Sequence, residues 1–180
     1  MKLIANLRRF GAARQGLAAL EFAIIAPLLM VPLLLGTVDL IDIMGANKRA
    51  QNAAASLADV VARDTEVTDA ELAGMWEALD LLMFPNDPGD MQIRITSISI
   101  ENATTARVVW SEGHGGMSGR TTGSTVGGID SRMMVPGTSI IMAESTYKHY
   151  APLRFLFPGE ISMTHTAYRR SRLVDPIARG

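Results

Sequence analysis

The sequence contains no cysteine and only three histidines among its 180 residues. The lack of cysteine excludes disulfide bonds and thiolate metal sites, although it does not identify the compartment. Two of the histidines, His149 and His165, fall in neighbouring predicted strands, but two imidazoles without a clear carboxylate partner make a poor metal site. We therefore expect neither a metal ion nor another cofactor.

Sequence patterns of nucleotide-binding proteins and hydrolases are also missing. Seven glycines lie between Gly113 and Gly128, but no Gly-Lys-Ser/Thr triplet occurs there and no strand leads directly into a helix. This segment is therefore predicted to be a mobile loop and not a phosphate site. No Gly-x-Ser-x-Gly turn is present to hold a nucleophilic serine. The sequence predicts neither an enzyme nor a small-molecule substrate.

The charges are few and unevenly divided. The net charge is −1, which gives no electrostatic reason to expect nucleic acid as a partner. Residues 1–16 contain four basic residues and no acidic residue, whereas the remainder contains 13 basic and 18 acidic residues. A basic N-terminal segment before an apolar run and an acidic body is typical of a membrane-anchored chain. The four basic residues are Lys2, Arg8, Arg9 and Arg14.

An almost uninterrupted apolar run extends from Leu17 to Val38. As a helix it would be about 33 Å long, close to the thickness of about 30 Å of a bilayer core. Pro27 and Pro32 would disrupt a soluble helix, but in a membrane helix neighbouring groups can satisfy the freed carbonyls. We expect a transmembrane helix over residues 17–39.

An apolar run of this kind can also be a cleaved secretory signal, a buried core helix or an uncleaved signal anchor. The run is long for a secretory signal, and Met44 is too large at the first position of the candidate site pair with Ala46. The basic flank argues against a core helix, whereas the signal anchor stays open. Basic residues precede the run, so we expect a cytoplasmic N-terminus and an external position after about Asp39, where Asp39 and Asp42 mark the boundary.

One acid lies inside the apolar run and requires a reason, because a carboxylate deep in lipid is costly. Gly16 ends the basic leader, and counting from Leu17 as the first residue, Glu21 is fifth and Phe22 is sixth. This arrangement resembles the processing site of type IV pilins and pseudopilins. The resemblance implies that a prepilin peptidase cuts after Gly16 and that Glu21 pairs with the ammonium group of Leu17 in a neighbouring subunit.

The wider run, "GLAALEFAIIAPLLMVPLLLGTVDL", is more specifically similar to TadE-like pseudopilins of tight-adherence (Flp) pilus systems. The shared features are an alanine-rich stretch, Glu-Phe, a proline soon afterwards and a leucine-rich run that ends at a glycine. The resemblance is specific from Arg14 to about Asp64 and only general beyond. It implies a single-pass protein of the bacterial inner membrane that helps to assemble or prime a pilus and has other pilus subunits as partners.

One feature of the chain departs from this family, and one other class of function stays open. Major pilin-like subunits of this type are very short and this chain is not, so it resembles an accessory or minor subunit. A function from another class, a signal-anchored periplasmic enzyme or sensor domain, stays open as the alternative. A catalytic cluster in a pocket would favour that alternative.

The residues from 40 to 180 are expected to form one periplasmic domain. Ala50, Ala54, Leu57 and Val61 make a narrow helical stripe, whose small side chains either let another helix come close or pack on the protein's own sheet. The stripe can also continue the membrane helix outward. A second helix is expected to begin at Thr68, with Glu71 as the other half of a capping box. Its apolar face is expected to contain Leu72, Met75 or Trp76, Leu79, and Leu82 or Met83.

Four strands are expected after the second helix. They correspond to residues 91–101, with a bulge at Ser97, and to 106–112, 137–152 and 159–172. Consecutive strands at such short spacing argue for an antiparallel sheet. The fold class predicted from sequence is therefore α+β, with an N-terminal membrane helix and a small outer domain.

Overall fold

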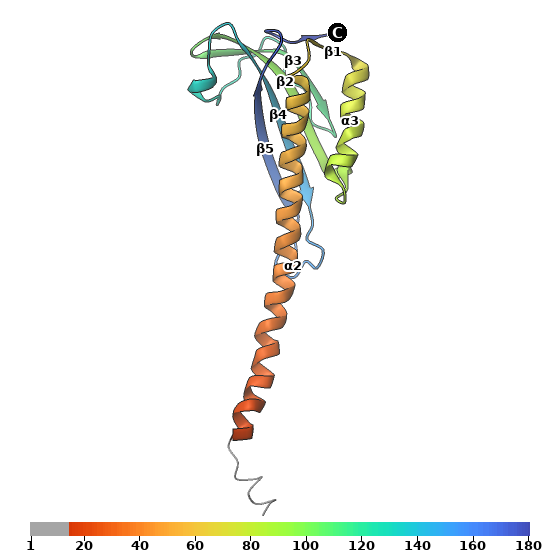
Figure 1. The fold of residues 1–180 in the computed structure, drawn as a ribbon, viewed down its shortest axis with the longest axis vertical. Coiled ribbons are helices and arrows are strands. Elements are labelled where there is room, and N and C mark those ends of the chain that lie inside the picture. Colours follow the sequence, from red (N-terminus) through yellow and green to blue (C-terminus); the bar gives the residue numbers. More distant parts are fainter. Residues whose placement is uncertain (1–14) are drawn as a thin grey trace, which may run out of the picture.

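The computed structural model describes residues 15–180, and its most prominent element is one very long helix (Figure 1). This helix, α2, runs without interruption over Gln15–Val61 and contains both Pro27 and Pro32. At 1.5 Å per residue it is about 70 Å long. Its C-terminal half lies against a sheet, and its N-terminal half extends away from the domain.

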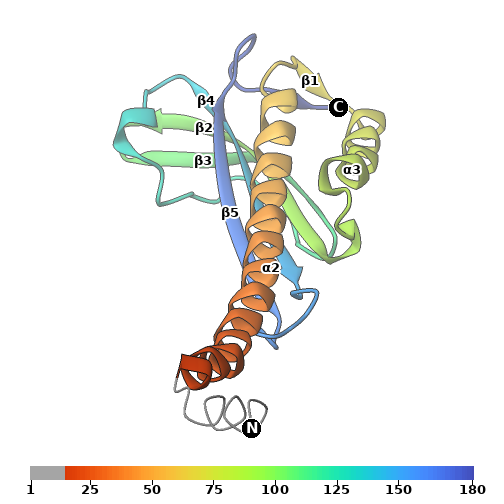
Figure 2. The same ribbon diagram turned by 60° about the horizontal axis from the view of Figure 1, so that its bottom comes forward.

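The domain is built on a four-stranded antiparallel sheet with the order β3-β2-β4-β5. The strands are β2 (Met91–Asn102), β3 (Thr105–His114), β4 (Ser139–His149) and β5 (Ile161–Arg170). Figure 2 shows α2 crossing the sheet, and its contacts are mainly with β4 and β5. The predicted α+β class, the further helix and the antiparallel sheet are confirmed.

A second helix, α3 (Asp69–Met83), lies beside α2 on the same face of the sheet (Figure 1). The predicted capping box is present, because Thr68 Oγ1 accepts from the Glu71 N–H and the Glu71 carboxylate accepts from the Thr68 N–H at 2.7 Å. These bonds from Thr68 hold the pKa of Glu71 below its ordinary value. The helix buries the predicted apolar face, namely Leu72, Met75, Leu79 and Met83.

The strand β2 contributes to both faces of the sheet. Met91, Ile93 and Ile95 belong to the cluster under the helices, whereas Ile98 and Ile100 belong to a second cluster. The pairing of β2 with β4 is continuous through this change, so the apolar side chains alternate sides as in any strand. The apolar pattern shifts phase because opposite faces of β2 are buried at its two ends.

The irregularity predicted at Ser97 is present in the pairing of β2 with β3, but the extra residue lies on the partner strand and not in β2 as predicted. Ser97 pairs with Trp110 and Ile98 pairs with Val108, which leaves Val109 of β3 as the extra residue. A bulge inserts one residue in one strand and increases the local twist. It brings both Val109 and Trp110 to the helix-covered side.

Two very short strands join the C-terminal segment to the end of α2. β1 (Glu66–Val67) pairs in parallel with β6 (Ala178–Arg179). The carbonyl of the buried residue Ile177 accepts a hydrogen bond from the indole N–H of Trp110 at 2.9 Å. The C-terminal segment is thus bonded both to the end of α2 and to the sheet.

The glycine-rich loop packs back on the sheet at several points. A Cβ at Gly113 would lie 1.7 Å from the carbonyl oxygen of Met117, and one at Gly119 would lie 2.4 Å from that of Ser111. These glycines allow backbone to approach backbone, which is a structural reason for their presence. Farther along the loop, Val126 is buried in the second apolar cluster. The mobility expected of this loop stays a prediction.

Candidate functional site

The residues of the expected processing site lie in the first turns of α2. Gly16, Leu17, Glu21 and Phe22 are all exposed, and within residues 15–180 a Cβ at Gly16 would meet no atom within 4 Å apart from its chain neighbours and the adjoining backbone of its own helix. Leu17 and Glu21 are one helical turn apart and therefore lie on the same side of the helix. The basic leader before Gln15 lies outside the described residues.

The N-terminal half of α2 exposes large apolar side chains on all sides. From Leu17 to Leu40, thirteen such residues have relative exposures between 46% and 73%. They are Leu17, Leu20, Phe22, Ile24, Ile25, Leu28, Leu29, Met30, Val31, Leu33, Leu34, Val38 and Leu40. Within residues 15–180, α2 is the one helix long and apolar enough to cross a membrane.

The C-terminal half of α2 has a different surface. The predicted stripe of Ala50, Ala54, Leu57 and Val61 is buried against the sheet, with relative exposures of 2% or less. Of the expected alternatives, packing on the protein's own sheet is the one observed, and the stripe is also the outward continuation of the apolar helix. Small side chains allow the helix backbone to lie close to the strands.

The two halves of α2 meet at a carboxylate that holds a loop. Asp39 is fully buried, with a relative exposure of 0%. Its carboxylate accepts backbone N–H groups from Leu153 at 3.0 Å, Phe155 at 2.8 Å and Leu156 at 3.2 Å. The loop between β4 and β5, residues 150–160, is therefore fixed to α2. Sequence reasoning placed Asp39 at the membrane boundary but gave it no partner.

The same loop also contacts α2 on the N-terminal side of Asp39. The Leu156 side chain packs on Gly36, where an added Cβ would lie 2.4 Å from Leu156 Cδ1. Leu156 also lines a shallow, mainly apolar hollow with Leu29, Pro32 and Leu40 of the helix. Gly36 is the glycine at which the leucine-rich run was expected to end. In the structure, its lack of a side chain leaves the space that Leu156 occupies.

Two histidines of the sheet face polar groups on α2. His149 Nε2 lies 2.6 Å from Asp42 Oδ2, and His165 Nε2 lies 3.0 Å from Asn47 Oδ1. The two imidazoles do not face one another, because His165 pairs with Ser145 in the strand register. Within residues 15–180, no group of three or more histidine, aspartate or glutamate side chains could hold a metal ion.

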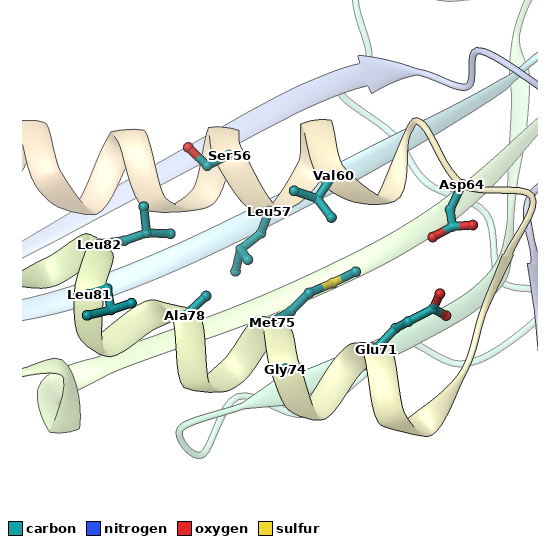
Figure 3. Close-up of a pocket in the computed structure, with 10 residues that line it drawn as sticks. All are labelled: Ser56, Leu57, Val60, Asp64, Glu71, Gly74, Met75, Ala78, Leu81 and Leu82. Carbon is teal, nitrogen blue, oxygen red and sulfur yellow. The ribbon is translucent and has the colours of Figure 1, made fainter.

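A groove of about 610 Å³ lies between α2 and α3 (Figure 3). Side chains from both helices point into it, and it is mainly apolar. Two of its lining residues are strongly exposed, Val60 at 50% and Leu81 at 82%. Asp64 and Glu71 lie at one end, where Glu71 is already engaged in the capping box. Sequence reasoning did not predict this groove.

A charged cluster lies between the glycine-rich loop and the sheet. Glu144 of β4 forms ion pairs with Arg94 of β2 and with Arg120 of the loop, both at 2.7 Å. Burial raises the pKa of Glu144, but the hydrogen bonds from the two arginines outweigh it and hold the pKa below its ordinary value. The pairing also raises the pKa of Arg120. This cluster holds the loop and presents no free reactive group.

Comparison with known proteins supports the family predicted from sequence. Residues 16–59 match the model of the TadE-like protein family. No curated protein and no solved structure matches the chain. The matched region contains the apolar half of α2, Asp39, and three of the four residues of the stripe that packs on the sheet. The resemblance to TadE-like proteins is thereby confirmed for this region.

Proposed function

We propose that this chain, which is TadE-like over residues 16–59, is a single-pass membrane protein that helps to assemble or prime a tight-adherence pilus. It acts through packing of its long helix and not through catalysis. The observation that carries the proposal is the division of α2 (Gln15–Val61) into an exposed apolar half and a half that is bonded to its own domain. Such a helix can pack against other subunits while it carries a folded domain outside the membrane.

The proposed topology follows from the charges around the span. Residues 1–16 form a basic cytoplasmic leader, 17–39 cross the inner membrane, and 40–180 form the periplasmic domain. A periplasm-active reporter fused at Gly180 is expected to be active. Activity of only a cytoplasm-active reporter at that position would reverse the topology.

The proposed maturation site is the bond between Gly16 and Leu17. Gly16 is exposed, and no side chain among the described residues beyond its chain neighbours lies within 4 Å of an added Cβ, which supports access by a peptidase. Gly16→Val should block processing by steric exclusion, and the precursor should keep its leader of 16 residues. Intact-mass measurement of the membrane-extracted protein checks this. A leader that is retained in wild-type protein, in cells with an active prepilin peptidase, would favour the signal anchor.

The proposed role of Glu21 comes after processing. The new ammonium group at Leu17 and the Glu21 carboxylate of an adjacent subunit would neutralise one another in a low-dielectric setting. Glu21→Ala should therefore be processed at least in part, yet fail to assemble, because loss of a buried counter-charge costs about 3–5 kcal/mol. Co-purification with pilus subunits measures the second effect.

The decisive experiment separates helix packing from simple anchoring. In a strain that lacks the protein, the wild-type chain is compared with a chain whose residues 22–38 are replaced by an unrelated apolar helix of equal length. Both chains should reach the membrane, but only the wild-type chain should restore pili. Restoration by both chains would show that the span is only an anchor, as expected of a periplasmic enzyme or sensor domain.

A further inference from the structure

The loop between β4 and β5, residues 150–160, has an unusual composition for a connection at a domain surface. Four of its large apolar side chains remain exposed although the segment is only eleven residues long. Their relative exposures are 47% for Leu153, 46% for Phe155, 54% for Leu156 and 37% for Phe157. Contiguous exposed apolar side chains of this kind mark a site of interaction with a partner or a membrane.

The position of the loop along α2 identifies its surroundings. Its backbone is bonded to Asp39, and the Leu156 side chain lies on Gly36, about 4.5 Å nearer the N-terminus along the helix axis. Both positions belong to the last turn of the proposed span. The apolar tip of the loop is therefore continuous with the exposed apolar surface of the helix.

From this continuity we infer that residues 150–160 are a second membrane contact, which enters the outer interface of the bilayer beside α2. The inference rests on the proposed function in one respect, namely that residues 17–39 cross the membrane. The occupant assigned to the exposed side chains is lipid, because lipid already surrounds the adjoining turn of the helix. Phenylalanine and leucine side chains are typical of segments that lie in such an interface.

The hydrogen bonds of Asp39 reduce the physical cost of placing a loop at this depth. Irregular backbone in contact with lipid is costly because its N–H groups find no water to bond. Here the carboxylate of Asp39 accepts three of these groups, from Leu153, Phe155 and Leu156. Asp39 is itself shielded by the loop, so the acid and the loop satisfy one another.

The polar residues of the loop fit the water side of the same interface. The Arg154 guanidinium lies 4.9 Å from the ring centre of Tyr150, and the Tyr150 hydroxyl donates to Glu160 at 3.2 Å. Glu160 also pairs with Lys148 at 3.4 Å. Arginine and tyrosine are common at the level of the lipid headgroups, where an apolar body and a polar end are both accommodated.

The absence of cysteine from the sequence allows a direct test of depth. Nitroxide labels are attached to the full chain at Leu153→Cys and, separately, at Phe155→Cys, in vesicles of phosphatidylcholine and phosphatidylglycerol. Collision with oxygen, which concentrates in lipid, is compared with collision with a water-soluble nickel complex. Both positions are exposed, and a thermal melt of each labelled protein verifies that the domain is folded.

Two further labels serve as controls. Leu28→Cys reports on the span. Leu173→Cys reports on the far end of the domain. Leu173 is next to the end of α2, since the Arg172 N–H donates to the carbonyl of Ala62. Ala62 is about 39 Å from Gly36 along the helix axis. Leu173 has a relative exposure of 66%, so its label should collide mainly with the nickel complex.

The expected result is that labels at Leu153 and Phe155 have an oxygen-to-nickel ratio several-fold above that at Leu173 and closer to that at Leu28. A ratio equal to that at Leu173, with Leu28 in lipid, would place the loop in water and overturn the inference alone. Protection from both reagents would show that protein covers the loop, which also overturns it. A Leu28 label in contact with water would show that residues 17–39 do not cross the membrane, and this would contradict the proposed function as well.

Discussion

The two halves of α2 have the same backbone conformation but opposite surfaces. The N-terminal half, residues 17–40, has bulky apolar side chains that stay exposed, whereas the C-terminal half, residues 46–61, buries a face made mostly of alanine. A large apolar side chain gains about 1.5–3 kcal/mol when it is removed from water. The exposed half therefore requires lipid or other helices around it, whereas the apolar face of the buried half is already covered by the sheet.

This comparison shows that side-chain size, and not helix propensity, distinguishes the surroundings of the two halves. Both halves continue one helix, and the N-terminal half even contains Pro27 and Pro32. Alanine lets a helix backbone approach a sheet, whereas leucine and isoleucine fill the space around a helix that has no sheet beside it. Substitutions in each half, and at their junction, test this distinction.

A proline should be tolerated in only one half of the helix. Ala54→Pro would remove a backbone hydrogen bond and create a clash in a fully buried turn, at a cost of about 3 kcal/mol or more. The detergent-solubilised chain should unfold at a much lower denaturant concentration, followed by the combined fluorescence of Trp76 and Trp110. Pro32→Ala, in the exposed half, should leave that midpoint unchanged, and an equal loss in both variants would contradict the comparison.

Added bulk should be costly only on the buried stripe. Ala54→Leu must force α2 away from the strands, and overpacking of this kind costs about 1–3 kcal/mol. Ser56→Leu, on the exposed side of the same turn, is the matched control and should change the free energy of unfolding by less than about 0.5 kcal/mol. Chemical denaturation of both variants measures the difference. Similar values would mean that α2 does not pack closely on the sheet.

The junction of the two halves should depend on Asp39. Asp39→Ala leaves the N–H groups of Leu153, Phe155 and Leu156 without their acceptor, and a buried unsatisfied donor costs about 1–3 kcal/mol. Hydrogen exchange of the segment 150–160 should become faster, whereas α3 should be unchanged. Asp42→Ala is the control, since Asp42 accepts no backbone group of this loop.

The smallest expected effect is a dependence on pH confined to the outer domain. The pKa of Glu144 is lower in the folded protein than its ordinary value of 4.5, so its ion pairs stabilise the fold fully above pH 4.5. This stabilisation is lost as the pH falls through the lower, folded-state pKa. Glu144→Gln should therefore reduce the loss of stability between pH 6 and pH 3, measured by denaturation. Glu77→Gln, at an exposed position of α3, should not.

Local patterns in the sequence predicted the helices well. The spacing of Ala50, Ala54, Leu57 and Val61 identified the buried stripe, and Thr68 with Glu71 identified the start of α3. These signals are local, because helix periodicity and capping involve residues at most a few turns apart. The strands were also predicted from local alternation and short connections.

The contacts that join distant segments could not be predicted in this way. Asp39 and Leu153 are 114 positions apart, and no pattern in the sequence around either residue indicates that the two are in contact. The parallel pair of β1 with β6 has two residues on each side, too few for any periodicity. The phase shift at Ser97 was visible, but burial on both faces of β2 can produce it as readily as an extra residue, and the extra residue lies on β3.

The way α2 lies along the sheet has a mechanical consequence. A pull on the N-terminal half, directed along the helix axis, would reach the domain as shear distributed over the whole buried face of α2 from Ala46 to Val61. Contacts loaded in shear must yield together, whereas contacts at a peeling edge yield one at a time. The hydrogen bonds of Asp39 to the loop 150–160 hold the end of this contact that is nearest the pull, where peeling would otherwise begin. When the helix is moved along its axis, the domain should therefore move with it and stay folded.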